Sequence, residues 1–150
     1  MNKAASGKSN FVLLSLGSNL GDRSRFISNA VESLRLFIDD IKVSSEYETE
    51  PYGVLDQAKF LNIALSGQTK LSPFTLLFYC KTIEYLLGRQ VRQRWHEREI
   101  DIDIVFYGGA EISLPLLEIP HKGIAERDFV IRPAMEIEPE LLKSFLDKQK

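Results

Sequence analysis

The sequence predicts an α+β fold, in which a mostly antiparallel sheet carries two helices packed on one of its faces. Two observations favour this class. Short runs rich in apolar and β-branched residues indicate four strands, and two segments between them place apolar residues at helical spacing. Their order along the chain is β-α-β-β-α-β, which is typical of the ferredoxin-like, split βαβ arrangement. We also expect an added C-terminal hairpin.

The first half of the chain supplies three of these strands and one helix. The apolar run FVLLSLG at 11–17 predicts the first strand, and the turn after it offers Asp22 as a helix cap. A helix is expected over 23–38 because one apolar face is formed by Ile27, Ala30, Val31, Leu34 and Ile38. The alternation of KVSSEYET at 42–49 and the run FLNIALSGQT at 60–69 predict two further strands.

The second half supplies the second helix, the last strand and the hairpin. Ser72 and Pro73 open the helix as its cap and its first residue, and Gly88 ends it. Beyond the basic segment 88–98, the run EIDIDIVFYGG predicts the last strand of the sheet. The remaining segments are expected to form, in order, a hairpin (110–123), a short helical turn (128–133) and a polar tail.

Composition indicates an ordinary globular protein. With 150 residues, 44% of them hydrophobic, we expect one domain over 1–150, with loosely ordered ends at 1–10 and 143–150. A net charge of −2 gives no global attraction to nucleic acid or membrane. The single cysteine, Cys80, allows no intramolecular disulfide, and neither a signal peptide nor a membrane span is visible. These features favour a soluble cytoplasmic protein, and we expect it to be a monomer.

The segment EIDIDIV places two carboxylates on one face of the last strand. Asp101 and Asp103 lie on the same side because residues two apart on a strand share a face. Like charges held this close repel, and aspartate is depleted in strands. Two interpretations are open: the face is fully solvated, or a cation binds there.

A basic loop leads directly into this strand. Its guanidinium groups, which suit phosphate, belong to Arg89, Arg92, Arg94 and Arg98. A solvated surface loop is the alternative, but a cationic loop beside paired carboxylates is what a nucleotide–magnesium complex requires. Trp95 either stacks on a ring or anchors the loop. A second cationic group, His121, Lys122 and Arg127, follows the hairpin.

One further side chain on the predicted elements suggests binding of a flat heterocycle. Asn62 lies within the strand FLNIAL, where a buried amide needs both donor and acceptor partners. Phe60 and Phe129 are aromatic, and core packing is the simpler explanation for each. Glu84 borders the apolar stripe of the second helix, where it is either exposed or close to a ligand.

Taken together, the chain resembles the 6-hydroxymethyl-7,8-dihydropterin pyrophosphokinase family of folate biosynthesis. The resemblance runs from about residue 11 to residue 141 and rests on four stretches in order: LGSNLGDR, YETEPYG…DQ…FLN, GR…RQRWHEREIDIDI and IPHKGIAERDFVIRPAMEIEPEL. It implies a ferredoxin-like fold and transfer of pyrophosphate from ATP to the pterin's hydroxymethyl oxygen, with release of AMP and participation of two magnesium ions.

The resemblance also implies roles for individual residues. The magnesium ligands are Asp101 and Asp103, and the catalytic residues are these two with Arg89, Arg92 and Arg98. ATP is expected to contact Glu84, Arg89, Arg92, Arg94, Trp95, Arg98, Ile104, His121, Lys122 and Arg127. The pterin is expected to contact Thr49, Pro51, Tyr52, Phe60, Asn62, Trp95, Asp101 and Phe129.

The sequence departs from the family pattern at four places: Glu50, where proline is frequent; Phe60 and Lys122, where tyrosine is common; and WHER at 95–98, where WGPR is usual. Two other functions are compatible with the residues alone. An RNA-binding module on the same fold would place aromatic and basic residues on an open sheet face, although the aspartates and the pI near 5.7 argue against it. A two-metal nucleotidyl transferase would use the same carboxylates but release pyrophosphate.

Overall fold

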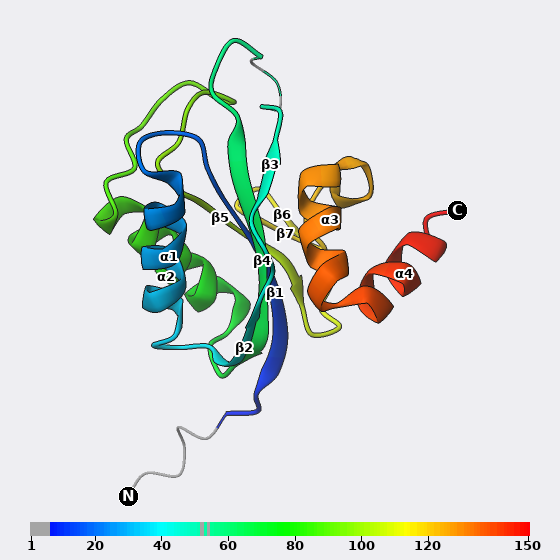
Figure 1. Cartoon of the computed structure of the whole chain (residues 1–150). Helices are drawn as coiled ribbons and strands as arrows, with labels where there is room; N and C mark the ends of the chain where they lie inside the picture. The colour runs from blue at the N-terminus through cyan, green and yellow to red at the C-terminus, as the bar shows by residue number, and fades with distance from the viewer. Residues whose placement is uncertain (1–6, 52, 54) are drawn as a thin grey trace, which may run out of the picture.

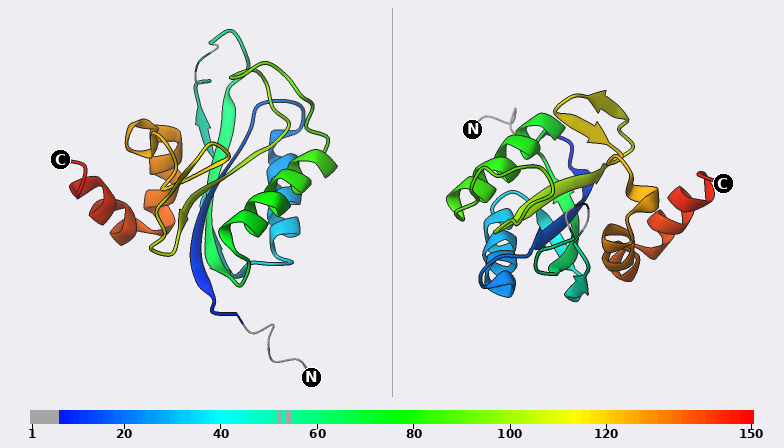
Figure 2. Two further views of the ribbon diagram at one scale, coloured as in Figure 1. Left: turned by 180° about the vertical axis from the view of Figure 1, so that it is seen from behind. Right: turned by 90° about the horizontal axis from the view of Figure 1, so that it is seen from above.

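The computed structural model of the chain describes residues 7–51, 53 and 55–150. It is built around one five-stranded sheet, with helices on both faces (Figure 1). Helices α1 (Arg23–Leu34) and α2 (Pro73–Leu86) cover one face, and helices α3 (Asp128–Ile137) and α4 (Pro139–Asp147) lie on the other (Figure 2).

The sheet has the strand order β2-β4-β1-β5. The short strand β3 also pairs with β4. The strands of this sheet are β1 (Asn10–Ser18), β2 (Asp39–Val43), β3 (Tyr47–Thr49), β4 (Phe60–Thr69) and β5 (Asp101–Tyr107). Every pairing in this order is antiparallel. The class predicted from the sequence, α+β with an antiparallel sheet, is therefore confirmed.

Alternation along the strands creates two separate cores. Leu14 and Leu16 of β1 pack with α1 and α2, whereas Leu13, one residue away, packs with α3 and α4. The second core does not cover the whole of its face. Register places Gly17 of β1 between Asn62 of β4 and Asp101 of β5, so polar side chains continue this face beyond the apolar core.

Two predicted elements differ from the structure in the first half of the chain. The helix expected over 23–38 ends at Leu34, and the strand expected over 42–49 is divided into β2 and β3. Ser44, between these strands, donates its backbone N–H to the Ala64 carbonyl, and its hydroxyl accepts the Ala64 N–H at 2.9 Å. The hydroxyl thus replaces a backbone acceptor and lets the strand break without leaving the Ala64 N–H unpaired.

The C-terminal third contains more helix than the sequence predicted. A hairpin of β6 (Ile112–Leu114) and β7 (Leu117–Ile119) is followed by a short 3-10 turn at Ile124–Glu126. The helical turn expected at 128–133 is the first part of the longer helix α3, which buries Val130 and Ala134. The expected polar tail, loosely ordered at 143–150, was wrong, because α4 runs to Asp147 and buries Leu142. In the part of the chain that the structure describes, no helix has the length and apolar character needed to cross a membrane.

Candidate active site

A pocket of about 70 Å³ opens where the polar end of the sheet meets the loops, and we call it the sheet pocket. Its floor is formed by the strand residues Ser15, Gly17, Asn62, Asp101 and Asp103. The other lining residues are Thr49, Glu50, Phe60, Trp95, His96, Arg98, Arg127 and Phe129. The fold therefore brings most of the predicted pterin residues to one place.

A second cavity, of about 160 Å³, lies between α2, β5 and the β6–β7 hairpin, and we call it the hairpin cavity. Its lining includes three basic side chains, Lys81, His121 and Lys122, the acidic Glu118 and the predicted Ile104. Asp103 lines this cavity as well as the sheet pocket. Two ligands bound in the two cavities would therefore meet at this carboxylate.

Asn62 is held in a defined orientation at the floor of the sheet pocket. Its side chain is 3% exposed, and its Nδ2 donates to the Thr49 hydroxyl at 2.6 Å. Gly17 leaves space for this amide, because a Cβ at that position would lie 2.8 Å from the Asn62 Oδ1 atom. The Thr49 hydroxyl thus orients the Asn62 amide, and the missing side chain at Gly17 leaves room for the amide oxygen.

Because the resemblance implies that Asn62 contacts the pterin, we expect Gly17→Ala to weaken pterin binding by roughly 10-fold, since the added methyl group displaces this amide. Nucleotide binding should change by less than about twofold, since Gly17 is not among the residues expected to contact ATP. Calorimetric titration of each ligand measures both effects. An equal loss of both affinities would instead indicate general misfolding.

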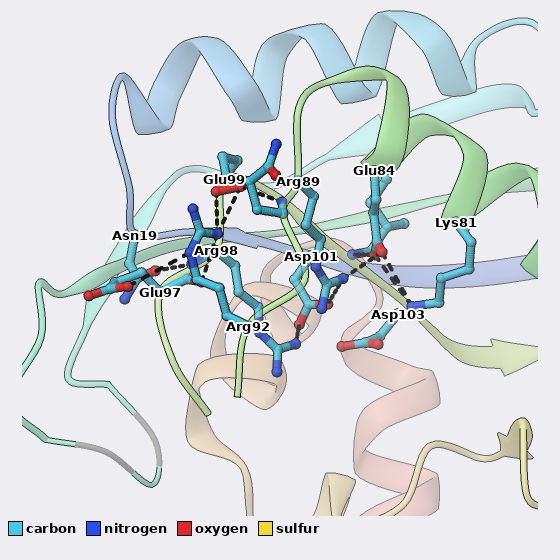
Figure 3. A network of polar contacts seen from close by, with 12 residues as sticks. Asn19, Lys81, Glu84, Arg89, Arg92, Glu97, Arg98, Glu99, Asp101 and Asp103 are labelled. Carbon is cyan, nitrogen blue, oxygen red and sulfur yellow. Dashed lines mark hydrogen bonds and ion pairs between the residues drawn. The ribbon is translucent and has the colours of Figure 1, made fainter. Parts of the chain in front are cut away.

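A network of guanidinium and carboxylate groups connects α2, the basic loop and β5 (Figure 3). Glu84 of α2 is 3% exposed; it accepts the Ile102 N–H at 2.7 Å and pairs with Arg89. Arg89 also contacts Asp101 Oδ1 at 3.1 Å, and Arg98 contacts Asp101 Oδ2 at 3.2 Å. Both oxygens of Asp101 are therefore engaged by arginine.

Asp103 has a different environment from Asp101. Burial and the neighbouring Asp101 charge raise the pKa of Asp103 to about 7. His121 Nε2 lies 3.9 Å from Asp103 Oδ1, and burial, followed by the charge of Arg127, lowers the pKa of His121. Lys81 Nζ lies 3.4 Å from each oxygen of Glu84, and its charge opposes the rise in the pKa of Asp103. A cation next to Asp103 would therefore stabilise its charged form.

The pair of aspartates fits a magnesium ion that also binds a ligand. Among the described residues, no group of three or more His, Cys, Asp or Glu side chains is arranged to hold a metal ion. Magnesium is commonly held by one or two carboxylates together with phosphate oxygens and water. Asp101 and Asp103 fit that mode of binding, because phosphate oxygens would supply the other ligands.

Three arginines of the basic loop, Arg89, Arg92 and Arg98, are paired with carboxylates. Arg92 pairs with Glu99, which is 6% exposed and also accepts the Gln90 N–H at 3.0 Å. Arg94 lies over the Trp95 ring, 4.6 Å from its centroid. Four arginines in one short loop would be expected to repel one another without ATP, but acidic residues pair with Arg89, Arg92 and Arg98. Movement of this loop on ligand binding stays a prediction.

The other predicted residues are placed as follows. Pro51 is buried, and Tyr52 lies outside the described residues. Arg127, expected to contact ATP, lines the sheet pocket and lies over the Trp95 ring at 5.7 Å. Ile104 is buried on the side of β5 that faces α1 and α2.

The family described as 7,8-dihydro-6-hydroxymethylpterin-pyrophosphokinase (HPPK) has a sequence model that matches residues 13–139. The chain belongs to this family. It is therefore an ATP-dependent pyrophosphokinase of folate synthesis, which transfers pyrophosphate to hydroxymethyldihydropterin. The function and the enzyme class inferred from the sequence are thus confirmed.

Curated relatives named 2-amino-4-hydroxy-6-hydroxymethyldihydropteridine pyrophosphokinase agree with this placement. The one from Aquifex aeolicus is 43% identical over 131 residues, which cover 87% of this chain and 82% of the relative. The one from Bacillus subtilis is 42% identical over 130 residues, which cover 85% and 78%.

Solved structures support the fold. The wild-type HPPK-DHPS of Plasmodium falciparum, crystallised with pteroate, superposes with a TM-score of 0.73 at 16% identity. The match covers 96% of this chain but only 43% of that longer chain. At this identity, the likeness concerns the fold alone.

Several residues that line or border the two cavities were not predicted from the sequence. Lys81 and Glu99 belong to this group, since each gains its place through contacts with residues of other segments. Ser15 and Gly17 were also missed. Residues two apart on β1 share a face of the sheet, and the register pairs Ser15 with Asp103 and Gly17 with Asp101. Both residues therefore lie on the floor of the sheet pocket.

Proposed function

We propose that the sheet pocket holds the dihydropterin and that the hairpin cavity holds ATP, so that the transferred group passes beside Asp103. The observation that carries this proposal is that Asp103 lines both cavities. A pyrophosphoryl acceptor and its donor must meet at one point, and the carboxylate pair marks that point.

In the sheet pocket, Phe60 and Phe129 are proposed to stack on the two faces of the pterin. Asn62 recognises its edge by hydrogen bonds, with the amide orientation set by Thr49. Pro51 and Tyr52 belong to the loop proposed to line the pocket with its backbone. The proposal follows from the chemistry of the ligand, since a flat heterocycle combines two apolar faces with a polar edge.

In the hairpin cavity, the nucleotide is proposed to contact Ile104, His121 and Lys122. Lys81 is added to these predicted residues, because its ammonium group lines the same cavity and lies beside Glu84. The arginines proposed to face the phosphates are Arg89, Arg92, Arg94, Arg98 and Arg127. Their planar groups pair well with phosphate oxygens.

Asp101 and Asp103 are proposed to hold two magnesium ions together with the ATP phosphates. Bound magnesium neutralises phosphate charge and orients the transferring group. The protein groups then do little covalent work, because their task is to position both substrates and to stabilise charge. Arg98 is the arginine expected to matter most for the rate, since it contacts Asp101 and, unlike Arg89, also lines the sheet pocket.

We expect Trp95 to report closure of the basic loop. Its fluorescence should change when a non-hydrolysable ATP analogue with magnesium and the pterin are both added, because the phosphates compete for arginines that now pair with carboxylates. A fluorescence titration, together with hydrogen exchange of residues 89–98, measures this. An unchanged signal combined with identical, slow exchange would indicate a static surface.

The proposed reaction is tested by incubating the protein with ATP, magnesium and 6-hydroxymethyl-7,8-dihydropterin and separating the products. The proposal predicts AMP and a pyrophosphorylated pterin, and neither without magnesium. Release of pyrophosphate with a nucleotidylated acceptor would support the nucleotidyl transferase instead. The RNA-binding alternative is disfavoured, because α3 lies against the sheet face that such modules leave open.

The organisation of the chain completes the proposal. We propose a single pyrophosphokinase domain of ferredoxin-like topology, supported by the strand order and by the two helices that connect its halves. A cytoplasmic monomer is proposed as well. The compartment is supported by Cys80, which is free and buried.

A further inference from the structure

Glu136, near the C-terminal end of α3, holds the beginning of β3 by two hydrogen bonds. Its Oε1 accepts the Tyr47 hydroxyl at 2.6 Å, and its Oε2 accepts the Ser45 N–H at 2.9 Å. The hydrogen bond between Tyr47 and Glu136 lowers the pKa of the carboxyl and raises the pKa of the phenol. The carboxylate therefore stays an acceptor, and the phenol stays a donor, at neutral pH.

The strand that Glu136 holds is short. β3 has three residues, all of which pair with β4. Helix α3 lies beside it (Figure 1), and Arg132 of that helix lies over the Tyr47 ring, 5.4 Å from its centroid. From the opposite face, Arg23 of α1 pairs with Glu48 at 3.0 Å. Side chains of two helices therefore supplement the few backbone hydrogen bonds of β3.

The face of β3 that meets α3 continues into the sheet pocket. Tyr47 and Thr49 lie on this face, because side chains two apart on a strand point the same way. Register pairs Tyr47 with Asn62. Thr49 lines the sheet pocket, where its hydroxyl accepts the Asn62 amide at 2.6 Å. The residue that Glu136 fixes is thus two positions from the hydroxyl that orients Asn62.

Helix α3 also carries part of the pocket wall. Phe129, in its first turn, lines the sheet pocket together with Phe60 of β4. At the other end of the helix, Glu138 accepts the Ser66 hydroxyl of β4 at 2.7 Å. One helix therefore supplies an aromatic wall of the pocket and holds the strand that supplies Thr49.

We infer that Glu136 is a positioning residue for the pterin, which acts through β3 and Thr49. The inference rests on the proposed function, in which the pterin occupies the sheet pocket. Glu136 lines neither cavity, so it does not bind the ligand itself. Its two hydrogen bonds fix the start of β3, and the Thr49 hydroxyl then holds one orientation of the Asn62 amide. Without them, pterin binding must restrict the strand at a cost in affinity.

The test compares Glu136→Ala with Glu136→Gln in steady-state kinetics. Alanine removes both acceptors. Glutamine keeps both contacts, since its carbonyl accepts the Ser45 N–H and its amide donates to the Tyr47 oxygen. Glu136→Ala should raise the pterin KM roughly 5-fold, the effect of about one hydrogen bond, and Glu136→Gln should stay within about twofold of wild type. For both variants, kcat and the KM for ATP should change by less than about twofold.

A second background separates positioning from a general loss of stability. In Thr49→Val the hydroxyl that Glu136 positions is absent. Adding Glu136→Ala to this variant should therefore weaken pterin binding by less than about twofold more, as calorimetric titration of the pterin measures. A merely structural role would give the same loss, roughly 5-fold, in both backgrounds.

The matched control is Glu140→Ala, which removes the same charge from an exposed position of α4 that lines neither cavity. It should keep the wild-type pterin affinity. The inference is overturned if Glu136→Ala leaves the pterin KM unchanged, if Glu136→Gln or the control raises it equally, or if the loss is the same in the Thr49→Val background.

The proposed pterin site is decided separately by Asn62→Leu. Weaker pterin binding by this variant beside normal binding by Glu136→Ala would overturn only the role of Glu136. Unchanged pterin binding by Asn62→Leu would overturn the pocket assignment, and the inference with it.

Discussion

Asp101→Asn and Asp103→Asn should each lower kcat by roughly 1,000-fold, corresponding to about 4 kcal/mol of lost transition-state stabilisation. Asparagine keeps the size of the side chain but removes the negative charge that a magnesium ion requires. Melting temperature should not fall for Asp103→Asn. The pKa of this carboxyl is raised to about 7 by burial and by Asp101, so the charged form is disfavoured in the folded protein.

Steady-state rates at saturating ATP, magnesium and pterin, together with thermal unfolding, measure both effects. Asp39→Asn is the matched control, because Asp39 is an exposed aspartate of β2 that lines neither cavity. It should retain wild-type activity. Near-normal turnover of either site variant at ordinary magnesium concentration would exclude the assigned metal ligands.

Asn62→Leu should weaken pterin binding by roughly 10- to 100-fold, or about 1.4–2.8 kcal/mol, while ATP binding changes little. Leucine has a similar shape but leaves the polar edge of the pterin without partners inside a buried pocket. Thr49→Val should cause a smaller loss in the same direction, because it removes only the hydroxyl that orients the Asn62 amide.

Calorimetric titration of each ligand onto each variant separates these outcomes. Phe60→Leu is a useful comparison, since it reduces stacking without touching the hydrogen bonds of Asn62. Equal losses of pterin and ATP affinity in Asn62→Leu would show that this buried amide serves folding rather than recognition.

Elements with a strong periodic pattern were predicted well from the sequence. The run 60–69 became β4 with the same bounds, and Ser72 caps α2 as expected by accepting the Thr75 N–H. Of the two C-terminal helices, α3 was predicted only as a short turn and α4 was missed, because Pro133 and Pro139 suggest breaks. Pro139 instead occupies the first turn of α4, where proline is tolerated.

The site was only partly predictable. Asp101 and Asp103 could be recognised because a repeated aspartate is unusual in a strand. The sequence could not show which acidic residue pairs with which arginine of the basic loop, because loop residues have no fixed spacing. Tyr47 and Glu136 show the same limit: their hydrogen bond joins residues 89 apart in sequence, and only the folded chain reveals it.

The fate of the β-phosphorus of ATP tests the account most directly. The protein is incubated with magnesium, the hydroxymethyl-dihydropterin and ATP carrying ³²P only in its β-phosphate. Pyrophosphoryl transfer places the label in the pterin product and leaves AMP unlabelled, and Asp103→Asn should suppress this product. Label in ADP would indicate an ordinary kinase, and label in free pyrophosphate a nucleotidyl transferase; either result would contradict the account.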